Sequence, residues 1–215
     1  MIDRLNTLIV LTLYGWTAHH ALLRALVIVC AKWLVFLIPL LLVLAWWWPL
    51  PGRSQRRCVL LASGCSAMLN GCALLVLSHL VYSPRPFVVL HLVPLFPHAA
   101  NSSFPSDHML LGMALAAPLL WRLYRLGWLL CVISVLVGLA RVAGAIHWPS
   151  DILGTAILAL GLGWLALPLT AYALGRASEK WLQWLGLTKK SASQLAKAPR
   201  REPELPRSRL RAHNE

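Results

Sequence analysis

Apolar runs long enough to cross a membrane recur along this chain, and they constrain its fold more than any other feature. A helix of about 18 or more apolar residues can traverse a bilayer core of roughly 30 Å. With 59% hydrophobic residues, the 215-residue chain has the composition of one membrane-embedded domain rather than a water-soluble one. The sequence predicts an all-α, polytopic integral membrane helical bundle with about five transmembrane helices, at residues 25–48, 58–81, 106–122, 127–145 and 150–174.

The chain begins with a shorter apolar run that differs from these five. Leu5–Trp16 spans only about 12 residues and includes Asn6 and two threonines, which suits an interfacial or re-entrant helix over residues 1–20 better than a sixth span. The next run, Ala25–Trp48, is too long for the apolar region of a signal peptide and lacks a small-residue cleavage site. We therefore expect this second run to be retained as the first span.

The positive charge is distributed in a way that indicates topology. Of the residues behind the net charge of +13, nine lysines and arginines lie in residues 177–215, and others flank the spans at Arg53, Arg56, Arg57, Arg122 and Arg125. Short basic loops beside membrane spans are typical of the cytoplasmic side. The loop 82–105, the turn 146–149 and the N-terminus are then expected on the outer face.

The basic tail, residues 177–215, is expected to be a disordered cytoplasmic segment, because its later part is rich in proline and arginine. Anionic lipid headgroups are its expected partner. The concentration of positive charge in the loops and the tail disfavours a role in binding nucleic acid.

No metal or cofactor site is predicted. The five cysteines include no CxxC pair, so neither a disulfide framework nor a zinc site is indicated. Four of the seven acidic residues lie in the last 37 positions, which leaves only Asp3, Asp107 and Asp151 for the rest of the chain. No carboxylate cluster is therefore available to hold magnesium.

The predicted topology brings three polar clusters to the outer face. They are YSPRPF around Arg85, NSSFPSDH at 101–108 and ARVAGAIHWPSD at 140–151. Arg141 would lie about six residues inside the fourth span, where a charged residue is costly and usually faces a protein interior or a wet cavity. The alternative is an arginine that extends to the membrane interface.

Two of the clusters contain the tripeptide Pro-Ser-Asp, and each copy lies at the start of a predicted helix. Proline suits a first helical turn and the helix dipole favours an acidic side chain there, so a helix-start signal alone could account for Asp107. It does not account for His108 and His147. Two helix N-termini, two arginines and two histidines at one surface predict an anion site, most simply a phosphate site.

The two histidines add chemistry to binding. His147 and Asp151 are one helical turn apart, so the carboxylate could hold one ring nitrogen and leave the other as a nucleophile. His108, on a separate helix, could protonate a departing oxygen as a general acid.

The three clusters resemble the signature of the type-2 phosphatidic acid phosphatase superfamily, which runs Lys-x6-Arg-Pro, Pro-Ser-x-His and Ser-Arg-x5-His-x3-Asp. This chain has Ser-x6-Arg-Pro at 78–86, Pro-Ser-Asp-His at 105–108 and Ala-Arg-x5-His-x3-Asp at 140–151. The resemblance covers about residues 20–175. Ser78 and Ala140 depart from the family's lysine and serine, and the lost lysine removes one phosphate-binding charge.

Within that superfamily, ANSSFPSDH, RPF and HWPSD look most similar to the bacterial bacitracin-resistance type of undecaprenyl-diphosphatase. The resemblance implies a metal-independent membrane phosphatase domain, residues 21–176, in a bacterial plasma membrane with its site facing the periplasm. Its substrate would be a polyprenyl diphosphate lipid, undecaprenyl diphosphate, cleaved to undecaprenyl phosphate and phosphate. Such an enzyme would support lipid-carrier recycling in peptidoglycan biosynthesis, and with it bacitracin resistance.

The resemblance also implies roles for the site residues. His147 would attack the terminal phosphorus and become a phosphohistidine, Asp151 would orient it, and His108 would protonate the leaving group. The substrate-binding set would be Arg85, Pro86, Ser106, Asp107 and Arg141. Ser78 supplies no charge, so another cation could take the place of the family lysine. The candidate is Lys32, which would lie about 12 Å deep in the first span. The alternative is that the Lys32 side chain extends to the membrane interface.

Other interpretations use the same residues. The same chemistry could act on phosphatidylglycerol phosphate or phosphatidic acid, and another lipid could intercept the phosphohistidine in a phosphotransfer. A non-catalytic lipid transporter or scaffold on the same fold is disfavoured, because it would have no need of His108, His147 and Asp151 together.

Overall fold

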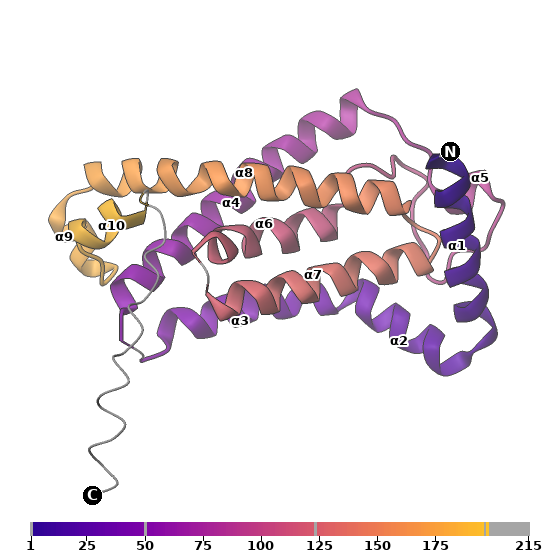
Figure 1. Cartoon of the computed structure of the whole chain (residues 1–215), viewed down its shortest axis with the longest axis horizontal. Coiled ribbons are helices and arrows are strands. Elements are labelled where there is room, and N and C mark those ends of the chain that lie inside the picture. Colours follow the sequence, from indigo (N-terminus) through magenta and orange to yellow (C-terminus); the bar gives the residue numbers. More distant parts are fainter. Residues whose placement is uncertain (1, 50, 123, 196, 198–215) are drawn as a thin grey trace, which may run out of the picture.

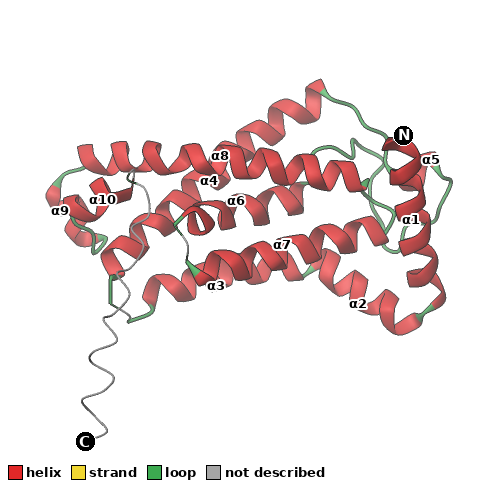
Figure 2. Cartoon of the chain, viewed as in Figure 1, coloured by secondary structure: helices red, strands yellow, loops and turns green. Residues whose placement is uncertain are grey.

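The computed structural model describes residues 2–49, 51–122, 124–195 and 197, and every regular element within them is helical (Figure 2). The helices lie side by side between two ends, with α1 across one end and α9 and α10 at the other (Figure 1). The chain is therefore an all-α bundle, as the sequence predicts. In chain order the elements are α1 (Ile2–His19), α2 (Ala21–Lys32), the 3₁₀ helix η1 (Leu34–Phe36), α3 (Leu37–Trp47), α4 (Arg53–Leu80), α5 (Pro86–Val89), α6 (Asp107–Trp121), α7 (Arg125–Ala143), α8 (Pro149–Arg176), α9 (Glu179–Trp184) and α10 (Lys189–Leu195).

Three helices are long and apolar enough to cross a membrane by themselves. They are α4, α7 and α8, with 28, 19 and 28 residues. The helix α6 is also apolar but has only 15 residues. Since a bilayer core needs roughly 20 apolar residues in a helix, the lengths and composition of these elements make the chain a multi-pass membrane protein.

The first predicted span, residues 25–48, is interrupted in the structure. α2 ends at Lys32, the 3₁₀ turn η1 follows, and α3 begins at Leu37. Pro39 accounts for the break, because a proline ring clashes with the carbonyl four residues earlier, here that of Val35 in η1. The prediction of one continuous helix is wrong at this point, although α2 and α3 still follow one another along the bundle (Figure 1).

The helix α1 turns away from α2 at an angle of 119° and lies across one end of the bundle (Figure 1). Asn6 ties it to the start of α8: its amide nitrogen donates to Ser150 Oγ at 2.9 Å, and its amide oxygen accepts from the Ser150 N–H at 3.1 Å. Val10 of α1 is fully buried, whereas Leu8 and Trp16 are more than half exposed. The helix α1 therefore packs one face against the bundle and exposes apolar side chains on another.

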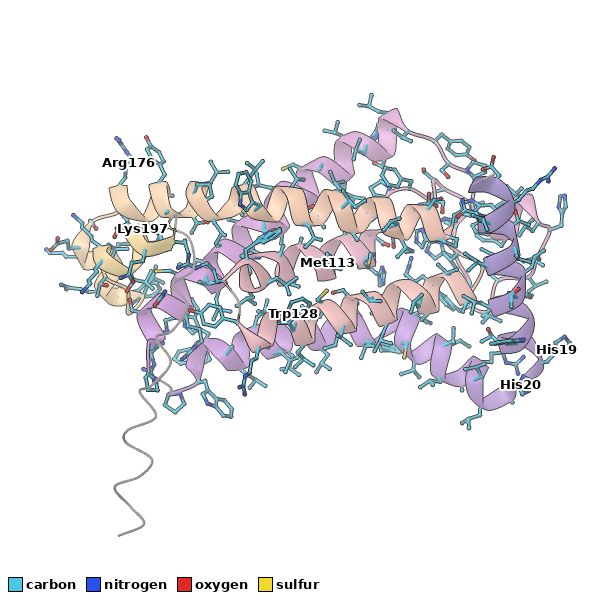
Figure 3. All side chains as sticks on the ribbon, viewed as in Figure 1. His19, His20, Met113, Trp128, Arg176 and Lys197 are labelled. Atoms are coloured by element: carbon cyan, nitrogen blue, oxygen red, sulfur yellow. The ribbon has the colours of Figure 1, made fainter. Side chains whose placement is uncertain are left out.

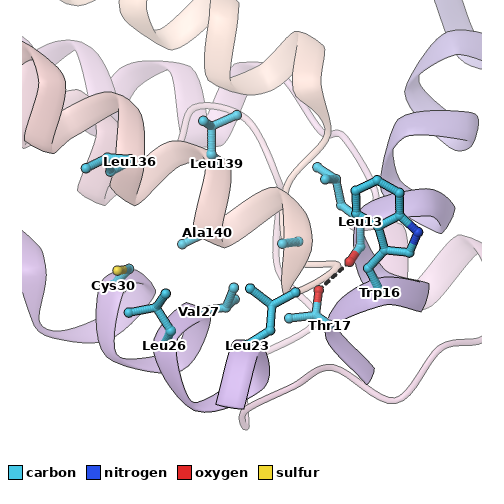
Figure 4. Close-up of a pocket in the computed structure, with 11 residues that line it drawn as sticks. Leu13, Trp16, Thr17, Leu23, Leu26, Val27, Cys30, Leu136, Leu139 and Ala140 are labelled. Atoms are coloured by element: carbon cyan, nitrogen blue, oxygen red, sulfur yellow. Dashed lines mark hydrogen bonds between the residues drawn. The ribbon is translucent and has the colours of Figure 1, made fainter. Parts of the chain in front are cut away.

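The elbow between α1 and α2 encloses an apolar pocket against α7 (Figure 4). Its volume is about 310 Å³, and its lining includes Trp16 of α1 and Val27 of α2. Ala140 and Ala143 of α7 complete the wall. These two alanines flank Arg141 in the sequence, so the pocket lies at the same end of α7 as this arginine.

The helix α6 lies at the centre of the bundle, packed against α4, α7 and α8. Small residues let these helices approach closely. A Cβ added to Gly163 of α8 would lie 2.3 Å from Ala117 Cβ of α6, and one added to Gly112 of α6 would lie 2.6 Å from Ser134 Oγ of α7. Helix pairs in membranes associate through such small residues, because lipid supplies little hydrophobic driving force between helices.

The end of the bundle opposite α1 carries the basic residues that the sequence assigns to one side of the membrane. Figure 3 shows Arg176 and Lys197 there, far from His19 and His20 at the α1–α2 elbow. The guanidinium of Arg57 lies 4.8 Å from the Trp46 ring centroid and donates to the Leu185 carbonyl at 2.8 Å. The arginines that indicate topology therefore also hold the C-terminal segment against the bundle.

The predicted disorder of residues 177–215 is wrong for the first part of this segment. α9 and α10 are helical, and four apolar side chains of this segment are buried in the core that α4 and α8 share: Leu182 of α9, Leu187 of the connection, and Ala192 and Leu195 of α10. Their burial offsets the entropy lost when the segment is ordered. Residues 198–215, which hold the proline- and arginine-rich part, lie outside the described residues.

We predict that Gly163→Ala destabilises the protein and that Gly161→Ala does not. The methyl group at position 163 would push α6 and α8 apart at Ala117, and such overpacking costs about 1–3 kcal/mol. Gly161 lies on the same helix but has nothing within 4 Å of its Cβ position. Thermal unfolding in detergent should therefore show a lower midpoint for Gly163→Ala alone. Equal midpoints for the two variants would contradict the close contact between α6 and α8.

Candidate active site

The three polar clusters of the sequence meet at the end of the bundle that α1 crosses. Arg85 precedes the short helix α5, Ser103 and Ser106 lead into α6, and Arg141 and His147 flank the end of α7. All five residues are buried, and Arg141 and His147 are 1% and 0% exposed. The convergence that the topology predicts is therefore present in the structure.

Both copies of Pro-Ser-Asp start a helix, as predicted, but in different registers. In α6, Ser106 is the N-cap and Asp107 is the first helical residue. In α8, Pro149 is the first helical residue and Asp151 the third, and the Asp151 carboxylate accepts a hydrogen bond from the Trp148 N–H at 3.3 Å. The same tripeptide therefore turns Asp151 back toward the start of its own helix and leaves Asp107 to contact other side chains.

Arg85 connects the clusters. Its Nε and Nη2 donate to Asn101 Oδ1 at 3.0 and 2.7 Å, and its Nη1 donates to the Ile146 carbonyl at 3.0 Å. The same Nη1 lies 3.3 Å from His147 Nε2. Burial, and after it the positive charge of Arg141, lowers the pKa of Arg85 to about 10. The guanidinium therefore still carries its charge at neutral pH.

His147 is held in one tautomer by its neighbours. Its Nδ1 lies 2.7 Å from the Ser103 carbonyl oxygen, which can only accept, so Nδ1 carries a proton. Nε2 is then free to accept from Arg85. Burial, followed by the charges of Arg141 and Arg85, holds the pKa of His147 well below its usual range, so the ring is neutral at neutral pH. A neutral imidazole with an unprotonated Nε2 is the form that can act as a nucleophile.

Asp151 does not hydrogen-bond to His147 directly, which differs from the contact that the sequence predicts. The Ser103 hydroxyl lies between them: it donates to Asp151 Oδ2, and its oxygen is 3.3 Å from His147 Nδ1. His147 lies before Pro149, the first residue of α8, so it does not share a helix face with Asp151. The carboxylate also bonds to the Trp148 N–H at the start of α8, and the ring bonds to the Ser103 carbonyl instead.

Asp107 holds Arg141 and His108 together. Its Oδ1 accepts from His108 Nδ1 at 2.9 Å and from Arg141 Nη2 at 3.3 Å. His98 Nε2 is a second partner of Arg141 Nη2, at 3.1 Å, and burial lowers the pKa of His98, which favours the neutral, accepting ring. The side chains of His108 and Asp107 are 28% and 54% exposed, whereas that of Arg141 is 2% exposed. The site therefore opens on the side of His108 and Asp107.

Two buried polar atoms at this site, Ser106 Oγ and Arg141 Nε, have no hydrogen-bond partner among the residues that the structure describes. Buried polar atoms are normally paired, because an unpaired one keeps its full desolvation cost. Both atoms can donate to the oxygens of an anion, and the N-terminus of α6 begins at the same serine. For a metal ion, by contrast, the described part of the chain offers no group of three or more His, Cys, Asp or Glu residues.

One predicted contributor, Lys32, lies outside these contacts, as does Ser78, which replaces the family lysine, and the predicted contributor Pro86 acts indirectly. Lys32 is exposed at the end of α2, where its ammonium lies 5.9 Å from the centroid of the Phe96 ring. Ser78 is exposed near the end of α4, and its hydroxyl donates to the Leu75 carbonyl at 3.1 Å. Pro86 is buried as the first residue of α5 and has no N–H to offer, so its contribution is to start that helix after Arg85.

Three residues of the site were not predicted: His98, Asn101 and Ser103. Asn101 and Ser103 belong to the NSSFPSDH segment, and only their position just before the Pro-Ser-Asp-His motif could have pointed to them. Nothing in the sequence distinguishes the buried Ser103 from its half-buried neighbour Ser102, because the direction of each side chain depends on contacts with distant segments. His98 carried no signal beyond its place in the outer loop.

Comparison with known proteins identifies the family. The family model described as the PAP2 superfamily matches residues 59–174, which include all three clusters. Undecaprenyl-diphosphatase BcrC of Bacillus subtilis (strain 168) is 32% identical over 157 residues, or 71% of this chain and 78% of that protein. The putative undecaprenyl-diphosphatase YbjG of Escherichia coli (strain K12) is 35% identical over 164 residues, or 74% of this chain and 79% of that protein.

A third relative, the bacitracin transport permease protein BcrC of Bacillus licheniformis, is 26% identical over 141 residues, or 65% of this chain and 68% of that protein. No solved structure matches the chain significantly. The extent of the family match and the identity to the first two relatives show that the chain belongs to the PAP2 superfamily.

Proposed function

We propose that this member of the PAP2 superfamily hydrolyses undecaprenyl diphosphate to undecaprenyl phosphate and inorganic phosphate. Two relatives whose names state that substrate align with more than two thirds of the chain. The observation that carries the reaction type is the state of His147, a buried neutral ring whose unprotonated Nε2 lies 3.3 Å from a charged guanidinium. A nucleophile next to a phosphate-binding cation is what phosphoryl transfer to a histidine requires.

In the first step, His147 Nε2 attacks the terminal phosphorus. The bond from Nε2 to phosphorus forms while the bond from phosphorus to the bridging oxygen breaks, which gives a phosphohistidine and undecaprenyl phosphate. Arg85 would then donate to phosphoryl oxygens rather than to Nε2. The unpaired Ser106 Oγ and Arg141 Nε supply further donors for the charge on the phosphoryl group.

His108 supplies the proton that the leaving oxygen needs. Its Nδ1 faces Asp107, which leaves Nε2 to exchange protons at the open side of the site. In the second step a water molecule attacks the phosphohistidine, gives its proton to His108, and releases inorganic phosphate. The donor of the first step thus becomes the acceptor of the second, and the ring returns to its starting protonation state.

We propose that the site faces the periplasm of a bacterial plasma membrane and that the basic end, including residues 177–215, lies in the cytoplasm. Lysines and arginines near the ends of membrane helices favour the cytoplasmic side. Anionic lipid headgroups are the proposed partner of this basic segment. With this orientation, the enzyme would hydrolyse undecaprenyl diphosphate, and so recycle the lipid carrier, at the periplasmic face of the membrane.

Labelling with a membrane-impermeant thiol reagent tests this orientation. In a variant whose native cysteines are replaced by serine, Val93→Cys lies in the outer loop at a position that is 78% exposed. We expect it to react in intact cells, while Arg176→Cys at the basic end reacts only after lysis. The reverse pattern would mean that the site faces the cytoplasm.

Phosphate release by purified protein tests the reaction and the substrate. We expect kcat/KM for undecaprenyl diphosphate to exceed that for phosphatidylglycerol phosphate and phosphatidic acid by about tenfold or more. His147→Ala should abolish release from every lipid, because the nucleophile is lost. His79→Ala, which changes an exposed histidine on α4, should leave the rate unchanged.

The outcomes separate the alternatives. Preference for another lipid phosphate would keep the mechanism and replace the substrate, and transfer of the phosphate to a second lipid would identify a phosphotransferase. Full activity in the His147→Ala variant would overturn the mechanism.

A further inference from the structure

We infer that Ser103 is a positioning residue that couples Asp151 to His147, so that the nucleophile is oriented through a serine rather than by the carboxylate itself. This inference rests on the proposed function, because it assigns a role in the same reaction. It concerns a residue outside the three motifs that identify the superfamily.

Every polar group of Ser103 is engaged at the junction of the three clusters. Its backbone carbonyl accepts the Nδ1–H of His147 at 2.7 Å, and its backbone N–H donates to the Ser83 carbonyl, also at 2.7 Å. Its hydroxyl donates to Asp151 Oδ2. The residue is fully buried, so water does not compete for these bonds.

The direction of the hydroxyl bond follows from the inventory of donors. A serine hydroxyl has a single proton to donate, and Asp151, when ionised, can only accept. The other nearby groups are the Ile146 carbonyl, at 3.5 Å, and His147 Nδ1, at 3.3 Å, which already carries a proton. The charged acceptor forms the stronger bond. The proton therefore points to Asp151, and a lone pair of Oγ is left to face the Nδ1–H.

This chain of bonds matters when the phosphohistidine forms. The ring keeps its Nδ1 proton while Nε2 bonds to phosphorus, so the ring gains positive charge and the bond to Ser103 strengthens. The serine hydroxyl, polarised by Asp151, stabilises that charge without any proton changing place. Hydrogen bonds in such buried chains reinforce one another. Losing the serine hydroxyl should therefore lower the rate of the chemical step more than it weakens substrate binding.

Ser102 provides a matched control in the same loop. Its hydroxyl lies within donating distance of two carbonyl oxygens, that of Val81 at 3.1 Å and that of Phe104 at 3.0 Å. The same hydroxyl accepts from the Ser83 N–H at 3.2 Å. It therefore helps to hold the loop but makes no hydrogen bond to His147 or Asp151. A loss of activity that came only from loosening this loop would follow from Ser102→Ala as well.

The test measures kcat and KM for the single variants in purified protein. We expect Ser103→Ala to lower kcat about 10- to 100-fold, with KM changed less than about threefold. Ser103→Thr keeps the hydroxyl and should restore most of kcat, and Ser102→Ala should retain wild-type kcat. Unchanged kcat in Ser103→Ala would overturn the inference.

A double-mutant cycle with Asp151→Asn gives an independent test, in which kcat is compared only between variants that fold as well as the wild-type protein. If the carboxylate acts through Ser103, Asp151→Asn should lower kcat strongly in the wild-type background but less than about threefold in the Ser103→Ala background. An equal loss in both backgrounds would show that Asp151 acts without the serine and would overturn the inference. A wild-type protein that releases no phosphate would instead overturn the proposed function, and this inference with it.

Discussion

The burial of one guanidinium, that of Arg85, organises this end of the bundle. A charged group removed from water must find partners, because an unpaired one costs several kcal/mol. Arg85 is 4% exposed and finds its partners in two segments distant in sequence, Asn101 on one side and the Ile146 carbonyl on the other. Satisfying Arg85 therefore fixes the loop before α6 against the turn before α8. That junction is what sets His147 Nε2 next to a positive charge and His147 Nδ1 on the carbonyl of Ser103.

Two other buried arginines, Arg57 and Arg141, differ in how fully the protein satisfies their donors. At the basic end, Arg57 lies on the Trp46 ring and donates to two carbonyls, those of Trp46 and Leu185. At the other end, Arg141 shares one nitrogen between Asp107 and His98 and leaves its buried Nε without a partner. Among the described residues, Arg57 leaves no buried nitrogen without a partner, whereas Arg141 keeps a buried donor for an anion. This contrast supports a phosphate at the α1 end of the bundle.

The sequence predicted well those features that depend on short-range rules. Both Pro-Ser-Asp tripeptides lie at the start of a helix, as the local rules for helix initiation predict. Features that depend on distant contacts were not predictable. Pro39 could kink a helix or end it, and the sequence pattern does not distinguish the two outcomes. Ser103 differs from its neighbouring serine only in the direction of its side chain. The order of α9 and α10 depends on a few leucines whose partners lie on α4 and α8.

In the proposed reaction, His147 carries the phosphoryl group during turnover. Rapid mixing of the purified protein with undecaprenyl diphosphate labelled in its terminal phosphate, followed by an alkaline quench that preserves phosphohistidine, measures this directly by peptide mapping. We expect a label on the peptide that contains His147, formed before inorganic phosphate and removed by a chase with unlabelled substrate. Release of phosphate with no labelled protein, or a label on any other residue, would contradict the role of His147 as nucleophile.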